Sequence, residues 1–142
     1  MNTVDAQEIQ NFSKDSSHWW DIQGPFKPLH RLNPVRLKYI KQQICAHYSL
    51  NFEDLKPYKD LKILDVGCGG GLVCEPMARL SGTVTGIDAD KNAIAVAIDH
   101  AQESGLDITY KATTSDALVK EGAQFDVVLA LEIIEHVSDP EA

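Results

Sequence analysis

The residues whose types and spacing are best suited to chemistry are four glycines that follow a short apolar run. The segment Lys62-Ile63-Leu64-Asp65-Val66 leads directly into Gly67-Cys68-Gly69-Gly70-Gly71. An apolar run stopped by glycines predicts a buried strand that ends in a tight loop. Glycine has no side chain and tolerates positive φ, so a ligand can approach such a loop closely. A plain tight turn would use the same glycines, and further residues must separate the two interpretations.

Two carboxylates and one leucine narrow the kind of ligand. Asp88 follows a second predicted strand and lies twenty-one residues after Gly67. A carboxylate there can accept hydrogen bonds from both ribose hydroxyls of NAD or S-adenosylmethionine, although it could also be a helix-start acid. Leu72 stands where the dinucleotide fingerprint has a small residue, which weakens the NAD interpretation. Asp65, inside an apolar strand, must find donors. The ligand's ammonium or the loop amides are candidates, and a nicotinamide has no need of such a residue.

A third group of candidate residues follows the last predicted strand, residues 125–131. If the chain turns helically there, Glu132, Glu135 and His136 share one face, and Leu131 would reach the adenine side of the pocket. Two carboxylates and an imidazole can hold a divalent ion, and oxygen-rich sets suit Mg²⁺. The acids could equally be helix-start residues, with His136 shaping the pocket or acting as a base. The spacing favours neither interpretation.

The elements that must position these residues alternate between strand and helix from residue 61 onward. Such alternation implies parallel pairing in a doubly wound α/β sheet. A doubly wound sheet normally continues past its switch point, so we expect the C-terminal half of the sheet to be absent and the chain to be a fragment or a truncated gene product. The predicted strands are residues 62–66, 83–87, 108–110 and 125–131; the predicted helices are residues 72–80 and a helix capped by Asp90, ended by Gly105 and buried through Ala93, Ile94, Ala97, Ile98 and Ala101.

Residues 1–60 differ in character and read as helices and loops. An aromatic cluster that includes Trp19 and Trp20 needs a surface to pack on, and the prolines of residues 24–28 predict a rigid loop. Asn33 is the expected N-cap of a helix with Pro34 at its first position. The apolar stripe and the neighbouring arginine of that helix are Leu37, Ile40, Ile44, Tyr48 and Arg36.

Composition and charge exclude some classes of function. The hydrophobic fraction of 44% is that of an ordinary globular protein, and no apolar run approaches the ~20 residues of a membrane span. Residues 61–142 hold five Lys/Arg against fourteen Asp/Glu, which argues against nucleic acid as a main partner. The basic stretch from Lys27 to Lys41 could meet an anionic membrane or ligand, or be a solvated helix face. Three cysteines without a Cys-x-x-Cys pair fit a reducing cytoplasm.

Several segments together resemble one family. Trp19-Trp20-Asp21 and residues 26–40, which read Phe-Lys-Pro-Leu-His-Arg-Leu-Asn-Pro-Val-Arg-Leu-Lys-Tyr-Ile, resemble the N-terminal signature of the ubiquinone-biosynthesis O-methyltransferases. Residues 64–71, 84–88 and 131–137 look like that family's cofactor loop and its next two motifs. The glycine loop is generic to class I methyltransferases, whereas the N-terminal segments are far more specific. The resemblance covers nearly the whole chain, but only the N-terminal part of the family's usual length.

The resemblance implies a Rossmann-like class I fold, with residues 1–60 as a helical cap on the substrate side and residues 61–142 as half of the cofactor-binding domain. It implies methylation of ring hydroxyls on polyprenylated phenol and catechol intermediates of ubiquinone synthesis, with S-adenosylmethionine as donor. By position, the cofactor contacts would be Arg36, Gly67, Asp88 and Leu131, and the Mg²⁺ ligands would be Glu132, Glu135 and His136.

The resemblance also implies a location and partners. A polyprenylated substrate is delivered from a membrane, so we expect a cytoplasmic protein that docks peripherally on the inner membrane and meets other ubiquinone-biosynthesis proteins. Three other hypotheses stay open at this point: another class I small-molecule methyltransferase, a nicotinamide-binding module, and a catalytically incomplete fragment that binds S-adenosylmethionine.

Overall fold

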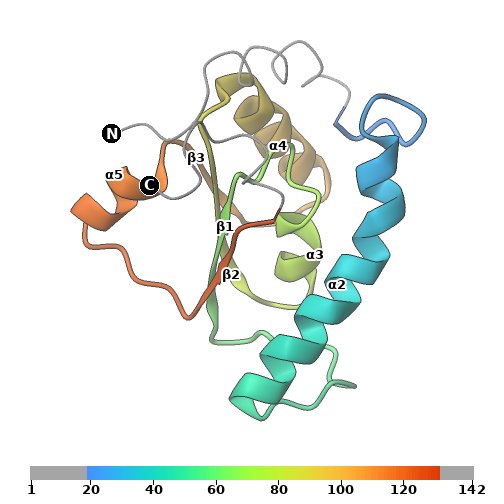
Figure 1. The fold of residues 1–142 in the computed structure, drawn as a ribbon, viewed down its shortest axis with the longest axis vertical. Coiled ribbons are helices and arrows are strands. Elements are labelled where there is room, and N and C mark those ends of the chain that lie inside the picture. Colours follow the sequence, from blue (N-terminus) through green and yellow to red (C-terminus); the bar gives the residue numbers. More distant parts are fainter. Residues whose placement is uncertain (1–18, 132–142) are drawn as a thin grey trace.

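A sheet of four parallel strands forms the centre of the molecule (Figure 1). The structure, a computed structural model, describes residues 19–131. The strands lie in the order β3-β2-β1-β4, and all three pairings are parallel, which confirms the expected doubly wound sheet. In chain order the elements are α2 (Lys27–Tyr48), β1 (Lys62–Val66), α3 (Cys74–Arg79), β2 (Thr83–Asp88), α4 (Lys91–Glu103), β3 (Thr109–Ala112), α5 (Ser115–Lys120) and β4 (Val127–Leu129).

The two faces of the sheet are covered by different helices. The chain moves outward from β1 to β2 and β3, and then returns past both to β4 on the other side of β1. Right-handed crossovers therefore put α3 and α4 on one face and α5 on the opposite face. Figure 1 shows this arrangement, with α2 beside α3 and α4. The point of reversal lies between β1 and β4, at the carboxyl end of β1, where ligands of such sheets bind.

Successive side chains of a strand point to opposite faces of the sheet, so they pack in separate apolar clusters. Ile63 of β1 packs in the larger cluster with Ile40 and Ile44 of α2, whereas its neighbour Leu64 packs on the other face with Leu118 of α5. A third cluster joins the start of the described chain to α4 and contains Trp19, Phe26, Leu72 and Ala93. The aromatic cluster predicted at the N-terminal side thus packs on the glycine loop and α4.

The prediction for the start of the long helix was wrong. Asn33 and Pro34 lie inside α2, which begins at Lys27 with Pro28 in its first turn. Proline is well tolerated in a first turn, so Pro28 starts the helix rather than extending a loop. Pro34 costs one backbone hydrogen bond inside the helix. The packing of Phe26 and Leu29 in the third cluster holds the extra turns in place.

Other local predictions fared unevenly. Asp90 caps α4 by accepting from Asn92 N and Ala93 N, and Gly105 follows the helix with a φ of +69°, so both ends were predicted correctly. Ile98, expected on the buried stripe, is 37% exposed. The fourth strand is shorter than predicted, and α5 was not predicted at all. The first strand has the predicted bounds, 62–66, and the remaining bounds differ from those predicted by one or two residues.

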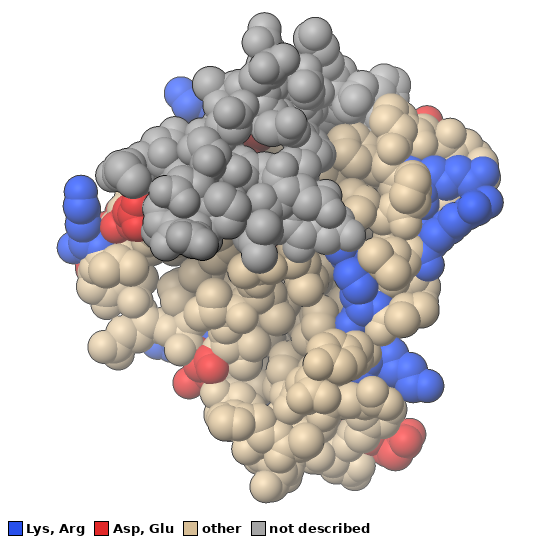
Figure 2. Space-filling model, viewed as in Figure 1, with Lys and Arg blue, Asp and Glu red and all other residues tan. Residues whose placement is uncertain are grey.

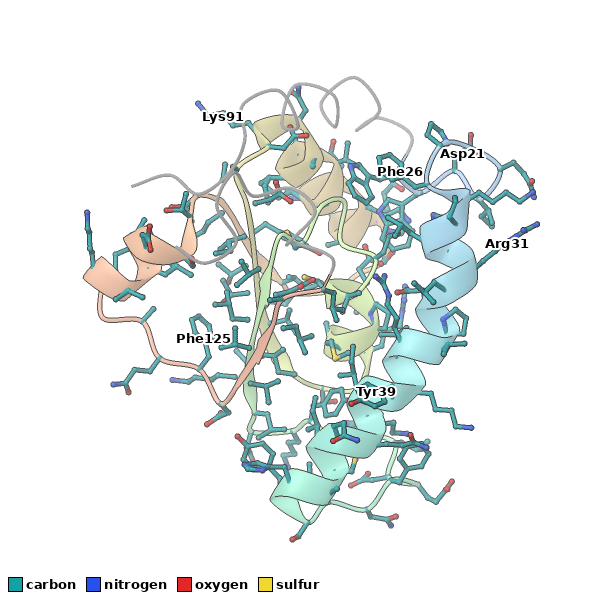
Figure 3. The ribbon with its side chains drawn as sticks, viewed as in Figure 1. Asp21, Phe26, Arg31, Tyr39, Lys91 and Phe125 are labelled. Atoms are coloured by element: carbon teal, nitrogen blue, oxygen red, sulfur yellow. The ribbon has the colours of Figure 1, made fainter. Side chains whose placement is uncertain are left out.

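Basic side chains gather along α2 (Figure 2). Arg31 and Lys38 are exposed there, next to the exposed apolar side chains of Leu32, Val35 and Tyr39. Figure 3 shows the contrast at the start of the helix, where Phe26 points toward the body of the protein and Arg31 points away from it. Within residues 19–131, no helix is both long and apolar enough to cross a membrane.

Candidate functional site: the glycine loop and its surroundings

The loop after β1 turns sharply because three of its residues adopt positive φ. The φ values are +75° at Gly67, +55° at Gly69 and +94° at Gly71, a region that glycine enters without steric cost. Gly67 N and Cys68 N both donate to Ile87 O at 2.9 Å, so the loop is tied to the end of β2. Gly67 is exposed and lies at the carboxyl end of the central strand.

Asp88 joins this loop to the start of α4. One carboxylate oxygen accepts from Gly69 N at 2.9 Å, and the other accepts from Asp90 N at 2.9 Å. The side chain is half-buried at the end of β2. Both interpretations of this residue therefore have a physical basis, since it organises the turn before the helix and also presents a carboxylate beside the glycine loop.

The other side of the loop is filled by aromatic side chains. A Cβ atom on Gly69 or Gly70 would overlap Trp19, and one on Gly71 would overlap the hydroxyl of Tyr110. We expected these glycines to make room for a ligand, but at these three positions they make room for the protein's own side chains. Among the loop glycines, the ligand interpretation is left with Gly67.

Two side chains from the N-terminal segment hold carbonyls of the loop. Trp20 Nε1 donates to Gly70 O at 2.8 Å, and Asn33 Nδ2 donates to Leu72 O at 2.8 Å. His30 Nε2 supports the segment by donating to Trp19 O at 2.8 Å. The glycine loop is therefore held from β2 by Asp88 and from the N-terminal segment by Trp20 and Asn33.

Trp20 also connects the N-terminal segment to α3 and α4. Its ring stacks on His100 with centroids 3.7 Å apart and an angle of 3° between the planes. His100 Nδ1 in turn donates to Glu75 at 2.6 Å, and Arg79 donates to the other oxygen of Glu75 at 3.2 Å. The Glu75 side chain is fully buried, so these partners satisfy a carboxylate that would otherwise be costly to bury.

Asp65 is the buried carboxylate of β1, and its side chain lies on the face that α2 and α3 cover. Burial raises the pKa of Asp65 to about 7, although the Cys74 thiol, which donates at 3.5 Å, and the charge of Arg36 both act to lower it. We predicted that Asp65 would find donors in a ligand ammonium or the loop amides, and the donor in the structure is instead this thiol. A hydrogen bond to Cys68 and burial hold the pKa of Cys74 well above its ordinary value, so the thiol keeps its proton at neutral pH.

Arg36, on α2, is the basic residue whose charge acts on Asp65. It is half-buried, and its guanidinium donates to Asn33 Oδ1 at 2.9 Å. The charge of Arg36 acts to lower the pKa of Asp65, and Asn33 connects the guanidinium to Leu72 O at the end of the glycine loop. An apolar groove of about 380 Å³ begins nearby, between α2 and β4, and reaches Leu131.

Comparison with known proteins identifies the family. Residues 63–142 match the family model of a methyltransferase domain. The chain belongs to this family. Among the solved structures, the Synechocystis magnesium protoporphyrin IX methyltransferase with bound S-adenosylmethionine matches with a TM-score of 0.68 and 20% identity, covering 94% of this chain and 65% of that one. Its similarity supports the Rossmann-like methyltransferase fold.

Curated relatives are closer in sequence. The ubiquinone biosynthesis O-methyltransferase of Brucella anthropi is 54% identical over 137 residues, which is 96% of this chain and 55% of that protein. The protein of the same name from Bartonella bacilliformis is 53% identical over the same share of both chains. This chain thus spans about half the length of the curated relatives it matches.

The structure brings three of the four predicted cofactor residues to one region of this methyltransferase fold. Gly67 follows β1, Asp88 ends the neighbouring strand β2, and Arg36 of α2 is connected to the same loop through Asn33. Leu131 follows β4 and is half-buried against the larger apolar cluster. The predicted metal ligands Glu132, Glu135 and His136 lie outside the described residues, 19–131.

Sequence reasoning missed several residues that shape this site. Asn33 was assigned to a helix cap, and Tyr110 and the Glu75–His100 pair were not singled out. The adjacent tryptophans were one available signal, because two neighbouring indoles need a partner surface. Gly86 of β2 was a second signal, because a Cβ there would lie 2.8 Å from the Tyr110 ring and 2.9 Å from Cys74 Sγ.

Proposed function

We propose that the protein methylates ring hydroxyls of polyprenylated phenol and catechol intermediates in ubiquinone biosynthesis, with S-adenosylmethionine as donor. The observation that carries the proposal is the tie between Asp88 and Gly69 N at the exposed end of β1, in a chain 54% identical to ubiquinone biosynthesis O-methyltransferases. The N-terminal segments that resemble this family are the ones that pack on the glycine loop.

The charged groups around the loop fit the chemistry of the donor. S-adenosylmethionine carries a carboxylate and an ammonium at one end and two ribose hydroxyls in the middle. Arg36 would hold the carboxylate, since a guanidinium pairs with it in a bidentate way. Asp65 would take the ammonium and Asp88 the ribose hydroxyls. Gly67 allows the close approach that this requires, and Leu131 would contact the adenine through shape and apolarity.

The residues of this half would act by binding and orienting. When bound, S-adenosylmethionine supplies a methyl group that its sulfonium already activates. Holding the donor at its carboxylate, ammonium and ribose fixes where that methyl points, so alignment with the accepting oxygen is not left to diffusion. The helical N-terminal part, residues 1–60, is proposed as the cap that closes this region on the substrate side.

Mg²⁺ is the proposed second cofactor, held by Glu132, Glu135 and His136. A phenol has a pKa of about 10, so little phenolate exists at neutral pH, and a divalent ion at the accepting oxygen would lower that pKa. We expect Glu135→Ala to abolish metal-stimulated turnover and to leave S-adenosylmethionine binding nearly intact. Equal turnover with and without a chelator would overturn the metal proposal.

Calorimetry with S-adenosylmethionine, and then with S-adenosylhomocysteine, tests the proposed function directly. We expect both ligands to bind this chain with one site, and NAD to give no heat of binding. A methyl-transfer assay with a prenylated catechol should accompany the titration. Binding without turnover would identify a cofactor-competent half that lacks the rest of the active site. Failure of both ligands to bind at millimolar concentration would overturn the proposal.

The surface of α2 supports a proposed peripheral attachment to the inner membrane from the cytoplasmic side. Exposed Arg31 and Lys38 lie beside exposed Leu32, Val35 and Tyr39, a combination that suits an anionic lipid surface. Sedimentation with phosphatidylglycerol vesicles should decrease with salt and with the double variant Arg31→Glu/Lys38→Glu.

Matched charge reversals elsewhere serve as the control for this attachment. Lys91 and Lys120 are exposed on α4 and α5, away from the α2 surface. The double variant Lys91→Glu/Lys120→Glu changes the net charge equally and should keep vesicle binding. Equal loss in both double variants would show a net-charge effect, and binding that ignores lipid charge would overturn the membrane proposal. Contacts with other ubiquinone-biosynthesis proteins remain part of the proposal, together with the absence of nucleic acid as a partner.

A further inference from the structure

We propose that Asn33 is a positioning residue, which sets the guanidinium of Arg36 against the glycine loop so that it can receive the carboxylate of the methyl donor. This inference rests on the proposed function, because it takes Arg36 as the group that holds that carboxylate. It assigns a role to a residue that the sequence pattern placed at a helix cap.

The side-chain amide of Asn33 makes two hydrogen bonds, one to the glycine loop and one to Arg36. Its Nδ2 donates to Leu72 O at 2.8 Å, and its Oδ1 accepts from Arg36 at 2.9 Å. The two residues are one turn apart on α2, so the amide bridges the helix to the loop and orients the arginine of the next turn. No other residue type of this size offers one donor and one acceptor on the same rigid plane.

The location of the bridge explains why orientation matters. Leu72 closes the glycine loop and is buried, with Trp19, Phe26 and Ala93 packed around it, so its carbonyl is a fixed point. Arginine has a long side chain that loses considerable rotamer freedom when it is held. Fixing the guanidinium before the ligand arrives removes that cost from binding and keeps its charge beside Asp65.

Trp20 provides an internal comparison, since it holds the same loop through a different carbonyl, that of Gly70. Its Nε1 donates to Gly70 O, and its ring is held independently by His100. Loss of the Trp20 donor should loosen the loop for any ligand. Loss of the Asn33 bridge should instead weaken only those ligands that carry the carboxylate.

The test is calorimetry of this chain with two ligands, S-adenosylhomocysteine and 5′-methylthioadenosine, the second of which lacks the amino-acid end. We expect Asn33→Ala to weaken S-adenosylhomocysteine roughly tenfold and to change 5′-methylthioadenosine less than twofold. Trp20→Phe, which keeps an aromatic ring but loses the donor, should weaken both ligands by a similar factor.

A double-mutant cycle shows whether Asn33 acts through Arg36. In an Arg36→Gln background, Asn33→Ala should cause no further loss of S-adenosylhomocysteine affinity, because the group that it positions is gone. Tyr48→Phe is the matched control: it removes a hydrogen bond of 2.7 Å from α2 to Asp126 O, at the far end of the helix, and should leave both affinities unchanged. Asn33→Ser gives the same comparison should the alanine variant unfold.

The outcomes separate this inference from the proposed function. If the unmodified chain binds neither ligand, the proposed function fails. If it binds both, then equal weakening of both ligands in Asn33→Ala, no weakening of either, or additive losses in the cycle would each overturn the positioning role. Selective, non-additive loss of S-adenosylhomocysteine affinity supports it.

Discussion

The two sides of the glycine loop are built differently. On the side of the strand ends, Gly67 is exposed and Asp88 is half-buried. On the side of the N-terminal segment, Gly69, Gly70 and Gly71 are buried against aromatic rings. One run of glycines therefore combines an exposed first residue, where we propose that the ligand approaches, with close packing at the other three.

This difference separates binding effects from stability effects. A substitution on the packed side should destabilise the fold, because the aromatic side chains cannot be displaced without opening a buried cluster. A substitution on the open side should leave the free energy of unfolding nearly unchanged and lower the affinity for the ligand.

Gly71→Ala should have the largest effect. At a φ of +94° an alanine is strained, and its Cβ would also overlap the Tyr110 hydroxyl, so we expect a loss of about 4 kcal/mol in the free energy of unfolding. Urea denaturation followed by circular dichroism measures it. Gly122→Ala is the matched control, since its φ is +74° and nothing lies within 4 Å of the added Cβ; it should cost about 1 kcal/mol.

Tyr110→Phe should rescue part of that loss in the double variant. Without the hydroxyl, the nearest atom to the added Cβ is the ring carbon Cζ at 3.4 Å, an ordinary contact. The steric part of the Gly71→Ala penalty should therefore disappear, leaving a penalty close to that of Gly122→Ala. Equal stability of the Gly71→Ala variant with and without Tyr110→Phe would show that the packed side is not as rigid as its contacts indicate.

Asp88→Ala tests the open side and should mainly affect binding. It removes the acceptor of Gly69 N and the proposed partner of the ribose hydroxyls, so we expect S-adenosylhomocysteine affinity to decrease about a hundredfold. The same titration applied to Asp88→Asn should show a smaller loss, because the amide oxygen still accepts one bond. An unchanged affinity in the alanine variant would remove Asp88 from the proposed binding site.

Asp65 should make the stability of the fold depend on pH. Its pKa is raised to about 7 in the folded protein, while an unfolded aspartate titrates near 4, so the folded state holds a proton that the unfolded chain releases in this window. The free energy of unfolding should therefore decrease by up to about 1.4 kcal/mol per pH unit between pH 4 and pH 7, relative to Asp65→Asn. Urea titrations of both proteins at pH 5, 6 and 7 measure the difference.

The same residue gives a ligand-dependent signature. A bound ammonium next to Asp65 would favour its ionised form, so binding S-adenosylhomocysteine at pH 6 should release a proton. Calorimetry in two buffers of different ionisation enthalpy detects this release, and Asp65→Asn should abolish it. Identical buffer dependence in both proteins would mean that Asp65 does not face the ligand's ammonium.

The strand pattern and the helix cap at Asp90 were predictable because their signals are local. The bounds of β1 follow from an apolar run that glycines stop, and the cap at Asp90 follows from its place before an apolar stripe. The packing around the loop was not predictable in this way. Trp20 lies fifty residues from Gly70, and no local pattern reveals which backbone carbonyl an indole will meet.

The start of α2 shows the same limit in a helix. Asn33 followed by Pro34 has the local form of a helix start, and an isolated segment would favour that choice. The tertiary contact of Asn33 with Leu72, together with the buried Phe26, favours the longer helix. A residue whose side chain suits a cap was used instead to connect two elements distant in sequence.

Tyr110→Phe alone should have the smallest effect, and its sign is informative. The hydroxyl is buried and makes no hydrogen bond of ordinary geometry within residues 19–131, while burial and the nearby Cys74 thiol raise its pKa above the ordinary value. Removing an unsatisfied buried hydroxyl is neutral or stabilising, by up to about 1 kcal/mol, whereas removing a bonded one costs about as much. Urea denaturation of the single variant distinguishes the two. A clear destabilisation would show that the hydroxyl has a partner in the folded chain, and that the packed side of the loop is tied by more than the fit of its rings.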